Sequence, residues 1–298
     1  MKTLAMNRLT LARGRVASRL TMLPVLVAAL ALAGCETMSG RSSTAGGIRS
    51  AGVAEVVDQS PQAAQANIAS LSEVIARNPN SAEPYNTRGV AYARNGRFQE
   101  AIGDFSTAIK LDPNNAAAYT NRALAYRQTG RSEPALSDFN QAIVANPNHG
   151  PAYLGRANLL RSQNNLEAAL QDLNTAIRLN PENAQAFHAR GLIYQRNGEH
   201  PRAITDFDNA IDRDPFTAAP YQARGQSLTA IGKNDSAIED FNAALNVDNK
   251  NSDAWAGLGL AYERQGNRAK AVESYQRALT ANPGNAMARE GASRVGRG

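Results

Sequence analysis

The sequence predicts an all-α protein whose helices stack one after another as a solenoid. Residues 82–285 consist of six tandem copies of a 34-residue unit, a length that accommodates one helix–turn–helix. Within each copy, small residues at the eighth, twentieth and twenty-seventh positions alternate at helical spacing with large apolar residues at the fourth and twenty-fourth. This alternation is typical of helix pairs that pack ridge into groove, and tandem pairs of this kind stack into an elongated array.

The first 34 residues have the order of a secretory signal peptide. Residues 1–19 are basic, and residues 20–33 are apolar. As a helix this apolar segment would rise about 21 Å, less than the ~30 Å hydrocarbon core of a bilayer, so we expect a cleaved signal and not a stable membrane span. The long basic segment leaves Met6 open as an alternative start of translation.

The segment Leu32-Ala33-Gly34-Cys35 resembles a bacterial lipobox. This resemblance implies that Cys35 receives a diacylglyceryl group on its thiol and becomes the mature N-terminus after cleavage. Two or three acyl chains would anchor the chain stably, since each buried methylene contributes ~0.8 kcal/mol. An aspartate directly after the lipidated cysteine would favour retention in the inner membrane. This position holds Glu36 instead, so the outer membrane is favoured. The alternative is an ordinary secretory signal followed by an incidental cysteine.

The segments that flank the repeats are predicted to be a tether and two caps. Residues 35–60, which begin with the lipidated cysteine, are rich in Ser, Gly, Thr and Ala and are predicted to form a flexible tether. Residues 61–81 match the second half of a unit, and residues 286–298 follow the last unit as a short cap and tail. Terminal repeats need such caps because they otherwise expose a core face.

Charge and cysteine content exclude several classes of function. The formal net charge is +6, but five of the 32 basic residues lie in the first 34 residues, which contain no acid. The remainder is nearly neutral, so the charge gives no support for nucleic-acid binding. The single cysteine, Cys35, allows neither an intramolecular disulfide nor a zinc site built from thiolates.

Regular helix breaks divide the copies. The fifteenth position is glycine in five copies and Asn164 in the third, as a left-handed helix C-cap requires. Prolines follow the second helix in every copy except the fifth, where Asn249 stands instead. These positions are Pro113, Pro147, Pro181, Pro215 and Pro283.

Together these residues resemble the tetratricopeptide repeat (TPR) family over residues 82–285. Eight positions agree across the six copies. The resemblance implies a right-handed superhelical α-solenoid of stacked helix-turn-helix TPR units, in which helix A of each unit lines the concave face and helix B lies behind it. The units are predicted at 82–115, 116–149, 150–183, 184–217, 218–251 and 252–285.

An arginine and an aspartate recur together at the seventh and twenty-third positions. Five copies carry both, whereas the sixth has Leu258 and Ser274 and so carries neither. Because pairing within a unit leaves no orphan, we expect five structural ion pairs between helix A and helix B. A ladder of arginines for an anionic ligand is the alternative. The predicted pairs are Arg88 with Asp104, Arg122 with Asp138, Arg156 with Asp172, Arg190 with Asp206, and Arg224 with Asp240.

The resemblance also indicates which positions of helix A would face a partner. They give an apolar-to-amide floor with arginines along one rim, which suits an extended or helical peptide of some acidic character. The alternative for each side chain is simple solvation. The Lys and Asn set of carboxylate-clamp TPRs is missing. The predicted groove residues are Asn86, Val90, Arg94, Thr120, Leu124, Arg127, Leu154, Asn158, Arg161, His188, Leu192, Arg196, Gln222 and Gln226.

No catalytic, cofactor or metal site is expected. The three histidines fall at different repeat positions, and no metalloprotease, nucleophile-elbow or phosphate-loop motif occurs. In organisation the chain is similar to bacterial TPR lipoproteins of the new lipoprotein I type, which are adaptors of cell-wall hydrolases, and to those that assist pilus assembly. These resemblances imply a lipid-anchored scaffold for envelope proteins or peptides.

Two alternatives to a peptide-binding monomer remain open. The arginine-rimmed groove would also suit an anionic glycan or lipid. Copies of the chain could instead stack through their terminal repeats into a homo-oligomer.

Overall fold

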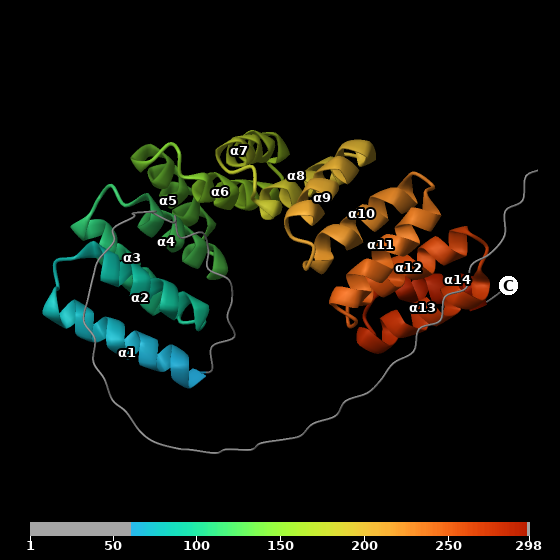
Figure 1. The fold of residues 1–298 in the computed structure, drawn as a ribbon, viewed down its shortest axis with the longest axis horizontal. Coiled ribbons are helices and arrows are strands. Elements are labelled where there is room, and N and C mark those ends of the chain that lie inside the picture. The colour runs from blue at the N-terminus through green and yellow to red at the C-terminus, as the bar shows by residue number, and fades with distance from the viewer. Residues whose placement is uncertain (1–60, 297–298) are drawn as a thin grey trace, which may run out of the picture. The chain divides into compact units, whose positions relative to one another are not determined.

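The structure is a computed structural model that describes residues 61–296 (Figure 1). The predicted signal peptide (1–34), the predicted lipidation site Cys35 and the whole predicted tether (35–60) therefore lie outside the described residues. The described part is all-α, with fourteen helices and no strand between residues 61 and 296. Within this range no helix has the length and apolar character of a membrane span.

The helices alternate as the 34-residue period predicts. The A helices are α2 (Ala82–Arg94), α4 (Ala116–Gln128), α6 (Gly150–Ser162), α8 (Ala184–Arg196), α10 (Ala218–Ala230) and α12 (Ser252–Arg264). The B helices are α3 (Phe98–Leu111), α5 (Ser132–Ala145), α7 (Leu166–Leu179), α9 (His200–Arg213), α11 (Asn234–Val247) and α13 (Arg268–Ala281). Single helices flank the six pairs, α1 (Pro61–Arg77) before them and α14 (Ala286–Gly296) after them.

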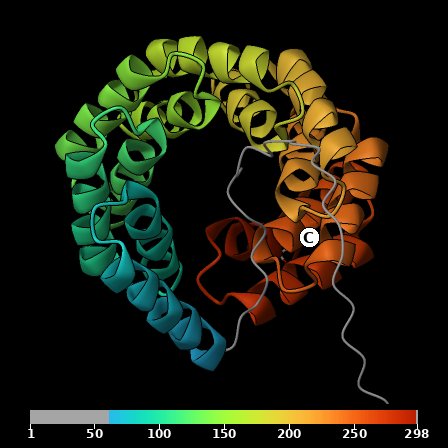
Figure 2. The same ribbon diagram turned by 60° about the vertical axis from the view of Figure 1, so that its left-hand side comes forward.

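The A helices form the inner layer of the array. Each A helix contacts the A helix of the next unit, whereas no two B helices among the described residues come into contact. Each B helix instead packs between its own A helix and the A helix that follows. Because the inner elements of a curved stack approach more closely than the outer ones, the A helices line the concave side, and Figure 2 shows the helix pairs following this curved path.

The core is a row of large side chains held between small ones. The twenty-fourth position of each unit is almost fully buried, and it lies between the eighth position of its own unit and the sixth position of the next. Every aromatic ring in this row has at least one glycine beside it. A Cβ at Gly191 would lie 2.6 Å from Phe207 Cε1, and one at Gly291 would lie 2.1 Å from Tyr275 Cζ. Glycine is therefore needed for close approach at these positions.

Leucine replaces the ring in the third unit, and alanine replaces the glycine. Leu173 is fully buried in one cluster with Ala157 and Ala189, which occupy the two flanking positions. The volume lost from the large residue is thus offset by added methyl groups on its neighbours. Since protein cores tolerate changes that conserve volume, this unit packs as closely as the others.

The helix breaks confirm the sequence pattern. The glycine at the fifteenth position has a φ between 72° and 79° in five units, and Asn164 has a φ of 65° in the third. Asn164 is the only non-glycine residue with positive φ among the described residues. Asparagine is enriched in this left-handed conformation, so the helix C-cap retains its geometry there.

Both ends of the array are covered by a single helix. Helix α1 packs against α2 and buries Ile68 and Ile75. Helix α14 packs against α12 and α13, where Ala288 and Val295 join the cluster around Tyr275. The terminal repeats thereby avoid exposing the face that an adjacent unit would cover.

Candidate partner-binding face

The arginine of each of the first five units pairs with the aspartate of its own unit. Nε and Nη2 donate to the two carboxylate oxygens at 2.7–2.9 Å, the two-pronged geometry that guanidinium and carboxylate groups favour. The aspartate side chains are 4–9% exposed and the arginine side chains 18–23%. The hydrogen bond to its aspartate raises the pKa of every one of these arginines.

The third nitrogen of the same arginines reaches back to the preceding unit, a contact that the sequence analysis missed. Nη1 donates to the side chain sixteen residues earlier at 2.6–3.0 Å. The acceptors are Ser72, Ser106, Asn140, Asn174 and Asp208. The sequence does contain a signal for this contact, since the position sixteen residues before each of these arginines is always Ser, Asn or Asp. We call this three-way arrangement the arginine clamp.

The clamp gives these arginines a structural role. All three nitrogen atoms of the guanidinium group donate to side chains of two successive units. Three of the five N–H donors are thus engaged within the protein and the side chain is mostly buried, so an arginine ladder for an anion does not fit this geometry. In the sixth unit Leu258 is buried at 3% exposure in an apolar cluster, and Ser274 donates to the Lys270 carbonyl instead.

The predicted groove residues lie on the A helices α2 to α10, and nearly all are half-buried or exposed. The prediction of Thr120 as a groove residue is wrong. Its side chain is buried, with the residue 3% exposed, and its hydroxyl donates to the Ala116 carbonyl within the same helix. Threonine commonly satisfies its hydroxyl on the preceding turn in this way, so Thr120 has nothing to offer a partner.

Two of the amide residues in the groove form hydrogen bonds with the next A helix or with the residue that caps it. Asn86 accepts from Asn121 Nδ2 at 3.0 Å, and Gln222 accepts from Asn251 Nδ2 at 2.8 Å. Gln195, which the sequence analysis did not select, donates to the Ala223 carbonyl and the Ser227 hydroxyl of α10. The repeat pattern gives no signal for Gln195. Its position in the unit holds arginine in two of the units and a different residue in each of the others.

Those two arginines, Arg127 and Arg161, are half-buried without ion-pair partners among residues 61–296. Burial lowers the pKa of Arg127, and the charge of Arg161 lowers it further. Burial and Arg161 also lower the pKa of His188 to about 4, so this imidazole is neutral at pH 7. The Nε of Arg161 is itself buried and has no acceptor in the described part of the chain.

The helices that carry these residues contain no acid at all. Neither Asp nor Glu occurs in α4, α6, α8 or α10. Arg196 on α8 is exposed and likewise has no ion-pair partner among the described residues. The central part of the concave face therefore carries positive charge that the described protein does not neutralise, beside the half-buried apolar side chains of Leu124, Leu154 and Leu192.

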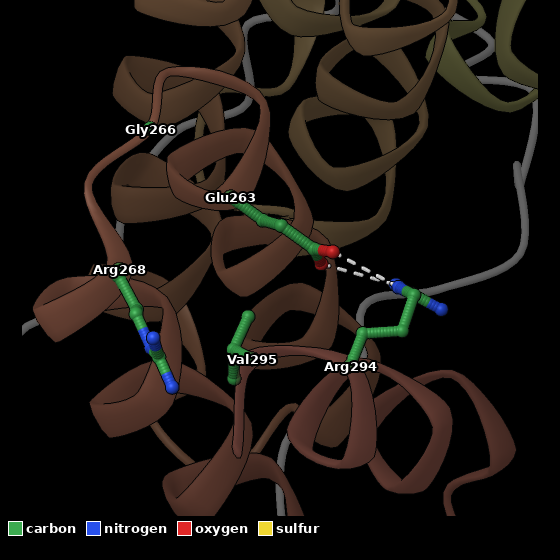
Figure 3. A pocket seen from close by; sticks show the side chains of 5 residues that line it. All are labelled: Glu263, Gly266, Arg268, Arg294 and Val295. Carbon is green, nitrogen blue, oxygen red and sulfur yellow. Dashed lines mark hydrogen bonds and ion pairs between the residues drawn. The ribbon is translucent and has the colours of Figure 1, made fainter. Parts of the chain in front are cut away.

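The C-terminal end of the array contains a pocket whose lining includes both acidic and basic side chains. The pocket has a volume of about 220 Å³ and lies among Glu263, Gly266, Arg268, Arg294 and Val295 (Figure 3). The Glu263 carboxylate accepts from Arg294 at 2.9 and 3.0 Å and from the Tyr275 hydroxyl at 2.6 Å. Its hydrogen bond to Arg294 lowers the pKa of Glu263. Because this carboxylate is already satisfied, the pocket is a less suitable ligand site than the concave face.

No site for a metal ion is evident in the described helices, where His, Cys, Asp and Glu do not gather in groups of three. The fold and the face together define a helical-repeat solenoid with a positively charged inner surface. Models described as TPR repeat match residues 157–198, and models described as tetratricopeptide repeat match residues 59–108, 86–151, 184–217 and 223–286. The chain belongs to the tetratricopeptide repeat family, whose members are generally non-enzymatic scaffolds.

Solved structures share this fold. The Cut9–Hcn1 hetero-tetramer of the APC/C contains a chain that is 19% identical, with a TM-score of 0.69 over 78% of this chain and 46% of that one. This chain therefore matches less than half of that protein. PilW, described as a type IV pilus biogenesis factor, is 17% identical, with a TM-score of 0.63 over 70% of this chain and 97% of PilW.

A third solved structure is YrrB, described as a TPR protein with an unusual peptide-binding site. It is 23% identical to this chain, with a TM-score of 0.54 over 63% of this chain and 97% of YrrB. At these identities the likenesses show the fold alone. A search among curated proteins gave no match to this chain.

Proposed function

We propose that this chain is a non-enzymatic scaffold of the bacterial cell envelope that holds a protein or peptide partner on its concave face. The observation that carries the proposal is the run of acid-free A helices from α4 to α10, whose arginines Arg127, Arg161 and Arg196 have no ion-pair partner among residues 61–296. Such a surface attracts an acidic partner, and the leucines beside the arginines favour one that also has apolar side chains.

The envelope part of the proposal rests on the sequence before residue 61. Residues 1–34 act as a signal peptide, Cys35 takes the lipid, and residues 36–60 tether the repeats to the membrane, with the outer membrane favoured by Glu36. The structural likeness to PilW agrees with a role in assembling an envelope structure such as a pilus. Recruitment of cell-wall enzymes would use the same face.

Partner binding is tested by crosslinking in intact cells, followed by purification of the chain from membranes. The groove variant replaces Arg127, Arg161 and Arg196 with Gln. A matched control replaces three exposed cations with Gln: Lys110, Arg178 and Lys250, which lie on B helices or in the turns that follow them. The control therefore removes the same charge from another part of the surface. We expect the groove variant to lose crosslinked partners that the control retains. Equal recovery by both variants would show that the concave face does not bind them.

The anchor is tested separately with Cys35→Ser. We expect this variant to lose its membrane association, because without the thiol no diacylglyceryl group can be attached. A variant that fractionates with membranes as the parent does would refute lipid anchoring, and it would leave the groove proposal unaffected.

A further inference from the structure

Arg127, Arg161 and Gln195 occupy the same repeat position, but only Gln195 has a hydroxyl acceptor on the next A helix. All three are the twelfth residue of their units, on α4, α6 and α8. Gln195 is satisfied by the next A helix, where the Ser227 hydroxyl and the Ala223 carbonyl accept its amide protons at 2.9 and 2.8 Å. Gln195 therefore needs no external ligand.

The equivalent of Ser227 is apolar where an arginine precedes it. Leu159 takes that position in the unit after Arg127, and Ile193 takes it in the unit after Arg161. Both side chains are buried, at 1% and 0% exposure. The two arginines are thus donors without the hydroxyl acceptor that the glutamine has, which agrees with the unsatisfied Nε of Arg161.

The two arginines are also close enough to repel each other. They occupy the same position on α4 and α6, which are in contact, and the charge of Arg161 acts on both Arg127 and His188. Like charges that are half-buried together destabilise each other, and a buried donor without an acceptor also destabilises the fold. An anion placed between them would remove both costs.

We propose that Arg127 and Arg161 form an anion-binding site that takes the side-chain carboxylate of an Asp or Glu in the partner peptide. Two guanidinium groups supply several N–H donors in planar forks that match a carboxylate. His188, neutral at pH 7, can donate a ring N–H to the same ligand without adding charge. This site specifies one residue of the partner, and it rests on the proposed function of the concave face.

A peptide suits the site better than a membrane or a glycan. The arginines lie on the inner layer of helices, which the flat surface of a bilayer cannot reach. Their neighbours Leu124 and Leu154 are half-buried and apolar, and apolar side chains beside fixed charges favour a chain with alternating acidic and apolar side chains over a uniformly polar glycan.

The test measures binding of fluorescein-labelled poly-L-glutamate to the purified full chain in detergent by fluorescence anisotropy. Poly-L-glutamate presents side-chain carboxylates at every spacing, so a mismatch of register cannot hide the site. We expect Arg127→Gln and Arg161→Gln each to weaken binding about tenfold, which corresponds to about 1.4 kcal/mol. The double variant should lose little more than either single one, because both groups bind the same carboxylate. Arg178→Gln, on the outer layer, is the control and should change affinity less than about twofold.

Further probes separate the possible sources of the anion. Hyaluronate offers carboxylates on a glycan, phosphatidylglycerol vesicles offer a lipid phosphate, and a Leu–Ser hexapeptide with a free or amidated end tests the C-terminal carboxylate. Arginine-dependent binding of any of these in place of poly-L-glutamate would overturn the proposal. The ¹⁵N resonance of the Arg161 Nε should shift when poly-L-glutamate binds.

The two proposals fail in different ways. Failure of poly-L-glutamate to bind, or binding that both arginine variants retain, would refute the carboxylate site. The crosslinking experiment would still decide whether partners occupy the concave face. Thermal unfolding of each variant checks that the array remains folded.

Discussion

The arginine clamp of the third unit allows a sharp test because the chain contains its own control. Arg156 donates to Asp172 through two bonds of 2.7 Å and to Asn140 through a third of 2.7 Å. The Asp172 side chain is 7% exposed, and that of Arg156 is 23% exposed. The sixth unit has Leu258 and Ser274 at the same two positions. The variants are therefore Arg156→Leu, Asp172→Ser, and both together.

The asymmetry in burial sets the expected magnitudes. Arg156→Leu leaves a buried carboxylate without its cation, which costs about 3–5 kcal/mol of unfolding free energy. Asp172→Ser costs less, about 1–3 kcal/mol, because Arg156 keeps its bond to Asn140 and is accessible to water. The double variant removes both charges and reproduces the pair of the sixth unit, so we expect it to cost no more than about 2 kcal/mol.

Urea unfolding followed by circular dichroism measures these differences. Hydrogen exchange of amides in α6 and α7 should accompany it, because long repeat arrays do not always unfold in one step. The exposed pair Arg277–Glu273, with side chains 55% and 60% exposed, is the control and should show coupling below about 0.5 kcal/mol. Costs for Arg156 and Asp172 that add to within about 0.5 kcal/mol would refute the pairing as a source of stability.

Three further predictions follow from packing and protonation. Gly155→Ala should destabilise the array by about 1–3 kcal/mol, because its Cβ would lie 2.3 Å from Phe139 Cε1, and adding Phe139→Leu should recover most of this loss by copying the third unit. Gly103→Ala has open space around its Cβ and should instead stabilise by about 0.5–1 kcal/mol; a loss in both alanine variants would contradict the packing argument. The pKa of His188 near 4 lies below its usual value, so only the unfolded state takes up a proton at this residue as the pH falls from about 6.5 to 5. The free energy of unfolding should therefore drop by about 2 kcal/mol by pH 5. His188→Gln should lack this part of the loss when thermal unfolding is followed against pH.

The structural roles of the repeating positions could be predicted from the sequence because the same type of residue occurs at each of them in most of the six units. The absence of both partners at Leu258 and Ser274 is what indicated pairing within a unit, and the fifteenth position indicated a left-handed cap even where Asn164 replaces glycine. Each of these features depends on backbone geometry, which every unit repeats.

The groove could be predicted only in outline, because it consists of the positions at which the units differ. Which way a side chain turns there depends on its immediate neighbours. Thr120 bonds to its own helix, Gln195 bonds to Ser227, and the Nε of Arg161 has no acceptor in the described helices, although all three residues lie on the same layer. A repeat position specifies the location of the Cα atom and not the hydrogen-bond partner of the side chain.

The spacing of the clamp has a consequence for how such a chain can change in length. Every clamped arginine joins the side chain sixteen residues before it to the one sixteen residues after it. Removal of residues 150–183 would place Arg190 sixteen residues after Asn140, with Asp206 still sixteen residues ahead. Whole-unit deletions and duplications therefore keep this spacing in every remaining clamp, whereas an insertion of any other length between an arginine and one of its partners changes it. The protein can gain or lose inner surface in steps of one unit while the joints between units stay the same.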